Sequence, residues 1–206
     1  MGGNMLMLIE LQLRKLIRER IRQAYSKKFN MQEFERLASS TDEFSDYPGD
    51  IVQARHYAEE RLQQIGDASS REALVLTSKT VLKIARSNRG VVQNKFEIEQ
   101  FEKLKHLPIT KIFKHDTDGG WLVSELVKPI KNEKQFKSIT GFFEDEAYNA
   151  IEDEDNQNEF VKLLRKLEAA GLDPAEFCIA EQWGINADGE LRLLDYGYGI
   201  THLRYR

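Results

Sequence analysis

The apolar residues near the start of the chain recur at the three- and four-residue steps of an α-helix. In residues 8–28 they line one side of the predicted helix, and basic residues occupy most of the other side. The apolar positions are Ile9, Leu13, Leu16 and Ile17. A lone helix of this length is marginal in water, so its apolar face must be covered. We expect the helix to dock on a partner protein or a second copy of the chain, or else to pack on its own domain.

Two further helices are predicted before residue 66. Asn30, followed three residues later by Glu33, is typical of a capping box at the start of a short helix. Asp50 is a candidate cap for a third helix, over residues 51–65, which would end at Gly66. The first 65 residues are therefore predicted to form a helical extension.

From Gly66 onward the pattern changes from helices to pairs of strands. Three pairs of apolar runs are each separated by a polar turn, which is typical of β-hairpins. The pairs are residues 72–76 with 80–85, 109–113 with 121–127, and 182–185 with 191–197. Helical periodicity predicts helices over residues 91–105, 132–141 and 158–171. The acidic stretch 144–157 is expected to be a solvated face or loop, because bunched carboxylates without a glycine turn rarely enclose a metal ion.

Three charged residues fall where the pattern predicts buried positions. Alternation over residues 80–85 places Lys83 in the middle of an apolar strand. Glu97 falls on the apolar side of the following helix, and Asp195 ends an apolar run before a glycine turn. Each of them alone could be an element-end residue that reaches solvent. An isolated buried charge is very costly, however, so Lys83 and Glu97 are predicted to form a buried pair.

The composition narrows the classes of function. A chain of 206 residues has room for one domain with an appendage. The net charge of −4 does not favour nucleic acid or an anionic membrane as a partner. Cys178 is the only cysteine, which excludes an intrachain disulfide and suits a reducing compartment. Residues 5–11 are apolar except for Glu10 but too short to span a membrane, so we expect no transmembrane segment and a cytosolic or assembly-bound protein.

The order of these features resembles that of protein-kinase-like proteins. "VLKIA" resembles their lysine-bearing strand, "RGVVQNKFEIEQF" the helix with the glutamate, "WLVSELV" the hinge and "LRLLDYG" the metal-binding turn. The resemblance covers about residues 66–200 and is greatest to small, pseudokinase-type proteins encoded by tailed bacteriophages. It implies an α+β fold, with an upper lobe of antiparallel hairpins plus one helix and a minimal lower lobe. The implied division is a helical extension over residues 1–65 and a truncated kinase-like domain over 66–206.

The resemblance also implies a site for ATP and Mg²⁺. In the family the strand lysine holds phosphates of ATP, the helix glutamate orients the lysine, and the late aspartate binds Mg²⁺. The matching positions are Lys83, Glu97 and Asp195 for these roles, Glu125 and Val127 for the hinge, Gly66, Ser69 and Ser70 for the phosphate-covering loop, and Gln182 for the second magnesium ligand. Serines stand where the loop of the family has further glycines, and a glutamine replaces the family's asparagine.

The chain departs from the family at two places. The position of the catalytic aspartate falls on Phe177, and neither Asp173 nor Glu176 has the right spacing to replace it. Without a carboxylate to accept the substrate's proton, the reaction loses a general base, which is commonly worth roughly 10²–10⁴-fold in rate. Nine residues separate Tyr196 from Arg206, and we expect no activation segment there.

Three interpretations remain. We favour a degenerate kinase-like domain that acts as a binding or structural module, in a phage particle or as a phage-encoded accessory factor in the host cytoplasm. The alternative is a small phosphotransferase or nucleotidyltransferase that depends on ATP and Mg²⁺ and uses Lys83, Glu97 and Asp195 with an unrecognised base. The third is an α+β protein without a ligand. The missing aspartate favours the first.

Overall fold

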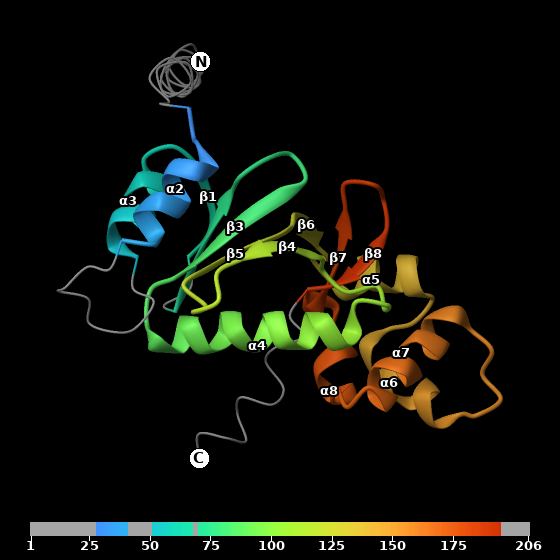
Figure 1. Ribbon diagram of the computed structural model, residues 1–206. Coiled ribbons are helices and arrows are strands. Elements are labelled where there is room, and N and C mark those ends of the chain that lie inside the picture. Colours follow the sequence, from blue (N-terminus) through green and yellow to red (C-terminus); the bar gives the residue numbers. More distant parts are fainter. Residues whose placement is uncertain (1–27, 41–50, 68–69, 195–206) are drawn as a thin grey trace, which may run out of the picture.

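The computed structural model describes residues 28–40, 51–67 and 70–194 of the chain. The helix predicted over residues 8–28 lies outside the described residues except for its last position, and Ser69 and Asp195 also lie outside them. The described part is α+β: helices flank a five-stranded antiparallel sheet, and a smaller sheet follows with a group of short helices (Figure 1). Within these ranges no helix is long and apolar enough to cross a membrane.

The five-stranded sheet is built from the first two predicted hairpins and one additional strand. Its order is β1–β2–β3–β5–β4, and all neighbouring strands are antiparallel. The strands are β1 (Gln63–Asp67), β2 (Arg71–Val75), β3 (Thr80–Ala85), β4 (Ile112–His115) and β5 (Trp121–Glu125). The long helix α4 (Asn88–Leu104) follows β3 and runs along one face of the sheet (Figure 1). This is the architecture of a protein-kinase-like upper lobe, as predicted.

The other face of the sheet is covered by two short helices, α2 (Met31–Ala38) and α3 (Val52–Glu59) (Figure 1). The Phe34 ring of α2 meets Trp121 of β5 edge to face, with ring centroids 5.5 Å apart. Their shared apolar cluster consists of Phe34, Ile51, Ala54, Ala58, Leu74, Leu82, Ile84, Trp121 and Val123. Burying this cluster fixes which face of β3 is apolar, so Lys83 points to the face on which α4 lies.

The start of α2 confirms one prediction and corrects a detail. The Asn30 side chain caps the helix by accepting hydrogen bonds from the N–H groups of Gln32 and Glu33. The predicted reciprocal bond from the Glu33 carboxylate is replaced by an ion pair with Arg36 at 2.7 Å. The Asn30 N–H instead donates to the Tyr57 hydroxyl at 3.0 Å, which joins α2 to α3.

The helix predicted over residues 51–65 is shorter than expected. It ends at Glu59, and residues 63–67 form the edge strand β1, which pairs with β2. Gly66 is therefore a strand residue opposite Ala73 and not a helix stop. The backbone hydrogen bonds that residues 63–67 make with β2 outweigh their local helical propensity. The extension before residue 66 is therefore not wholly helical.

The lower part of the molecule is built on a small sheet of order β6–β7–β8. Its strands are β6 (Val127–Pro129), β7 (Trp183–Asn186) and β8 (Leu191–Leu193), and its helices are α5 (Glu133–Thr140), α6 (Glu144–Glu152), α7 (Glu159–Ala169), α8 (Pro174–Phe177) and the 3₁₀ turn η1 (Ala180–Gln182). Trp183, Phe136 and Phe160 form the centre of its apolar core.

Two expectations for the lower part are corrected. The apolar run 121–127 is not one strand, because it changes sheets at Leu126: β5 belongs to the large sheet and β6 to the small one. The acidic stretch after residue 143 is not a loop over most of its length but the helix α6, which buries Ala147, Ala150 and Ile151. Its acidic side chains are mostly exposed, so the expected solvated face is confirmed.

Candidate functional site

Lys83 and Glu97 form the predicted pair, and a third residue joins them. The Lys83 Nζ lies 2.5 Å from Glu97 Oε1. The Arg71 Nη1 lies 2.6 Å from the other carboxylate oxygen of Glu97. Glu97 is 1% exposed. One buried carboxylate therefore binds two cations, one from β2 and one from β3.

Strand register brings the two cations to the same face of the sheet. Lys83 of β3 pairs with Ala73 of β2, and Arg71 lies two residues before Ala73 on the same strand. Side chains two residues apart on a strand share a face, so Arg71 points to the side of Lys83 and α4. The Asn94 side chain on α4 accepts a hydrogen bond from Arg71 at 3.4 Å and donates to the Gly119 carbonyl at 2.8 Å.

The start of α4 lies very close to the loop that precedes β2. The Ser87 side chain caps the helix by accepting from the Gly90 N–H. A Cβ atom on Gly90 would lie 2.0 Å from the Ser70 carbonyl oxygen, so only glycine fits there. This close approach sets the depth at which α4 packs, and with it the position of Glu97.

The electrostatics of Glu97 are dominated by its two partners. Burial by itself would raise the pKa of this carboxyl, but the charges and hydrogen bonds of Lys83 and Arg71 outweigh burial and lower the pKa below its ordinary value. The three side chains together carry an excess of one positive charge. The Lys83 and Arg71 side chains are 19% and 17% exposed, so part of that charge is accessible to an anion from solvent.

Ser70, the described end of the predicted phosphate-covering loop, directly precedes Arg71 of this cluster. Ser70 is buried, and its hydroxyl donates to Gln93 of α4 at 2.7 Å. Its carbonyl accepts from the Arg86 N–H at 2.8 Å, so the end of the loop is held between α4 and β3. Gly66 lies on β1, before the loop, and Ser69 lies outside the described residues.

The hinge positions connect the two sheets. The Glu125 carboxylate is buried and accepts hydrogen bonds from Asn186 at 2.7 Å and from Arg192 at 3.1 Å. Val127 lies on β6 opposite Asn186. The N–H groups of Glu125 and Leu126 donate to the carbonyls of residues 111 and 79, both at 2.8 Å, so these two groups are already hydrogen-bonded within the chain.

One buried polar atom near the hinge has no partner. The Ser124 hydroxyl is fully buried and has no hydrogen-bond partner within the described ranges. Ser124 pairs with Val81 of β3, two residues from Lys83, so it lies on the Lys83 face of the sheet. Ser124 is therefore a buried, unsatisfied hydroxyl on the same face of the sheet as Lys83.

The predicted metal and catalytic positions lie in the lower part. Gln182 ends the 3₁₀ turn, and its carbonyl accepts from the Leu194 N–H at 2.7 Å. Asp195, the next residue, is outside the described residues. Phe177, at the position of the family's catalytic aspartate, is 2% exposed and packs in the apolar core. No three His, Cys, Asp or Glu side chains in the described ranges are grouped as metal ligands.

Sequence reasoning missed two members of the site. Strand alternation could have identified Arg71, because Arg71 and Ala73 lie on the same face of β2 and Ala73 pairs with Lys83. Ser124 could not be selected, because a serine in an apolar strand carries no signal until its packing is known.

The residues that fit a phosphate group are Lys83 and Arg71. The described residues do not by themselves complete a magnesium site.

Comparisons with known proteins bear on the fold alone. No protein-family model and no curated protein matches the chain. Among solved structures, choline kinase LicA from Streptococcus pneumoniae matches with 18% identity and a TM-score of 0.38, over 66% of this chain and 63% of that chain. SAICAR-synthase from Saccharomyces cerevisiae matches with 13% identity and a TM-score of 0.37, over 65% of this chain and 72% of that chain. A GDP complex of aminoglycoside 2'-phosphotransferase-IIIa matches with 12% identity and a TM-score of 0.37, over 66% of each chain. The chain spans less than two thirds of the choline kinase.

Proposed function

We propose that the chain is a kinase-like binding module that holds a phosphate-bearing ligand, such as ATP, without transferring its phosphoryl group efficiently. The observation that carries this proposal is the pairing of one buried carboxylate, Glu97, with two partly exposed cations, Lys83 and Arg71. The pairing positions both cations, and both stay partly exposed next to Ser70. Phosphate oxygens are suited to such a pair, because guanidinium and ammonium groups donate charge-assisted hydrogen bonds.

One feature supports binding over turnover, and a second bears on which part of the ligand is recognised. Phe177 offers no proton acceptor at the family's catalytic position, and it is buried in the lower core. The N–H groups of Glu125 and Leu126 are engaged within the chain, which favours recognition of the phosphates over recognition of a base. The same proposal includes a role in a bacteriophage particle or as a phage-encoded accessory factor. The sequence resemblance is the support for this role.

The test is a thermal-shift titration with ATP, with and without Mg²⁺ or Mn²⁺, because a ligand that binds the folded state raises its melting temperature. We expect a saturable rise for the parent and a much smaller one for Lys83→Met. Lys103→Met is the matched control, since Lys103 pairs with Glu99 on the exposed side of α4, the helix that carries Glu97. No saturable rise with ATP or inorganic triphosphate would overturn the proposal.

A turnover assay separates this proposal from the alternative enzyme. Radiolabelled γ-phosphate should remain on ATP in the presence of the protein and generic acceptors. Efficient transfer or autophosphorylation that is lost in Asp195→Asn would instead support a phosphotransferase.

A further inference from the structure

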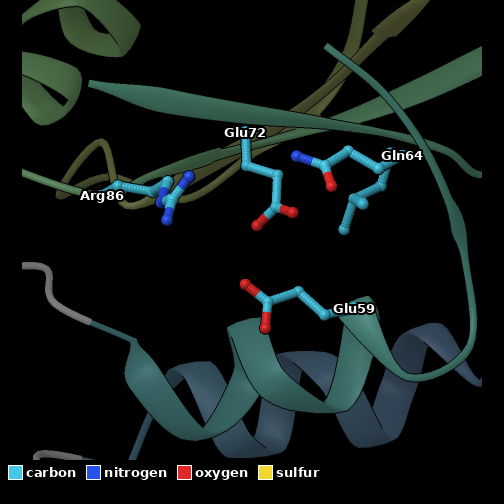
Figure 2. Close-up of a pocket in the computed structure, with 5 residues that line it drawn as sticks. Glu59, Gln64, Glu72 and Arg86 are labelled. Atoms are coloured by element: carbon cyan, nitrogen blue, oxygen red, sulfur yellow. The ribbon is translucent and has the colours of Figure 1, made fainter. Parts of the chain in front are cut away.

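A pocket separate from the Lys83 cluster lies between α3 and the face of the large sheet that α2 and α3 cover, called here the outer face. It has a volume of about 270 Å³ and is lined by Glu59, Gln64, Glu72, Leu74 and Arg86. Figure 2 shows the Glu72 carboxylate pointing from the sheet toward the Glu59 carboxylate, which points up from α3. The Gln64 and Arg86 side chains lie on the two sides of this pair (Figure 2). Four of the five lining residues are therefore charged or polar.

Glu72 is placed where a carboxylate is costly. Its residue is 3% exposed, and its Oε2 atom has no hydrogen-bond partner among the described residues. Buried polar groups are almost always hydrogen-bonded, and an unsatisfied carboxylate oxygen is particularly unfavourable. Alternation along β2 places Glu72 on the same face as Leu74, which excludes a route to the Lys83 cluster on the other face.

Glu59 already has partial compensation from its own helix. The Arg55 Nε lies 3.7 Å from one oxygen of Glu59, and the His56 Nδ1 lies 3.1 Å from the other. The side chain of Glu59 is 33% exposed, so it lies at the rim of the pocket and Glu72 lies at its base. The two carboxylates thus line the pocket from its rim at Glu59 to the buried Glu72 Oε2, which lacks a hydrogen-bond donor.

We propose that this pocket binds a small organic cation, a primary ammonium or guanidinium group, which donates hydrogen bonds to Glu72 and Glu59. The ligand's N–H groups supply the donor that Glu72 Oε2 lacks, and its positive charge separates two facing carboxylates. The Gln64 side-chain amide lies at the side of the pocket and offers one acceptor and two donors to a ligand there.

The lining favours an organic cation over a metal ion. Two carboxylates and one amide oxygen fall short of the six to eight oxygen ligands that Ca²⁺ takes. No grouping of three metal-ligating side chains occurs in the described part of the chain. The volume is slightly below the range of about 300–1,000 Å³ for drug-sized ligands, which fits a compact amine.

The titration of Glu72 supports the same conclusion. Burial, followed by proton sharing with Glu59, raises the pKa of Glu72 to about 7. The other charged groups around it are Arg86, which follows β3, and Arg55 and His56 on α3. A bound ammonium group would take the place of the proton between the two carboxyls. Binding should therefore be stronger at pH 8, where Glu72 is ionised, than at pH 6.

The test is a thermal-shift and calorimetric titration of the full chain with putrescine and with agmatine, at pH 6 and pH 8 and constant ionic strength. We expect a saturable rise in melting temperature at pH 8 and an apparent Kd at least tenfold weaker in Glu72→Gln. Glu102→Gln is the matched control, because Glu102 forms an exposed pair with Lys105 far from the pocket in the fold. Should Glu72→Gln fold poorly, Glu59→Gln at the rim is the second variant and should weaken binding in the same way.

Three outcomes would overturn the proposal. The first is no saturable response to either amine at pH 8. The second is an equal response to tetramethylammonium, which carries the charge but has no N–H donor and would indicate general electrostatics. The third is a response to MgCl₂ alone that Glu72→Gln removes, which would make the pocket a metal site.

Discussion

Lys83 and Glu97 are 14 residues apart in the sequence and meet at 2.5 Å, a strand lysine against a helix glutamate that is almost fully buried. The same carboxylate also binds Arg71. Because two cations share one anion, the three residues are not equivalent. Removing the anion takes from both cations the carboxylate that they share, whereas removing either cation leaves Glu97 paired with the other one.

The first prediction follows from this asymmetry. Glu97→Ala should lower the free energy of unfolding by on the order of 3–5 kcal/mol, because it leaves two partly buried cations without their anion. Lys83→Met should cost clearly less, since Arg71 still pairs with Glu97. Urea unfolding measures both. Glu99→Ala is the control, because its pair with Lys103 is exposed and worth about 0–1 kcal/mol. Equal stability of Glu97→Ala and the parent would mean that the cluster does not stabilise the fold.

The second prediction concerns the pH dependence of stability. The pKa of Glu72 is about 7 in the folded protein and 4.5 when unperturbed, so the folded state binds this proton more tightly. That contribution is fully present below pH 4.5 and is lost as the pH rises toward 7. When the pH is raised from 5 to 8, the free energy of unfolding of Glu72→Gln should therefore rise relative to that of the parent, by on the order of 1–3 kcal/mol. Urea midpoints at both pH values test this, and a pH-independent difference would contradict it.

The third prediction addresses the connection between the two sheets. Glu125 ends β5 of the large sheet and pairs with Arg192 of the small sheet at 3.1 Å, and both side chains are 9% exposed. Arg192→Ala should destabilise the chain by on the order of 3–5 kcal/mol, because Glu125 would remain buried without its cation. Lys162→Ala is the control, since Lys162 is partly exposed and pairs with the exposed Glu159. Chemical denaturation would show the difference, and similar midpoints for the two variants would argue against it.

The fourth prediction tests the packing of α4 against the loop before β2. Alanine usually stabilises a helix relative to glycine by about 1 kcal/mol. Gly90→Ala should nevertheless destabilise the protein, because its Cβ would lie 2.0 Å from the Ser70 backbone oxygen. Gly66→Ala is the control, since its Cβ would meet Ala73 at an ordinary 3.5 Å. Thermal unfolding distinguishes them, and a rise in melting temperature for Gly90→Ala would refute the close approach.

The fifth prediction concerns residues 1–27, which lie outside the described residues. The apolar cluster over the outer face of the sheet already contains Phe34, Ala54 and Ala58 from α2 and α3. A chain without residues 1–27 should therefore keep a melting temperature close to that of the parent. If the sequence-based prediction of a docking helix holds, the truncated chain should lose association with its partner or with itself, as measured by analytical ultracentrifugation. A large fall in melting temperature for a chain that was monomeric from the start would contradict docking.

Local patterns in the sequence were sufficient for most of the elements. The alternation in residues 80–85 predicted β3 and the orientation of Lys83, because period two reports a half-buried strand directly. Helical spacing predicted α4 and placed Glu97 on its buried face. Their pairing could also be predicted, since two opposite charges on apolar faces of consecutive elements have few other ways to be satisfied.

Only the tertiary structure decided how these elements meet. The strand β1 was predicted as the end of a helix, because its pairing with β2 is not visible in a local window. Arg71 joins Glu97 only through the β2–β3 register. The pocket of Glu72 and Glu59 exists because α3 docks on the outer face of the sheet. Periodicity reports which side of an element is buried, but register and docking depend on contacts between distant residues, and these contacts decided which charges share a site.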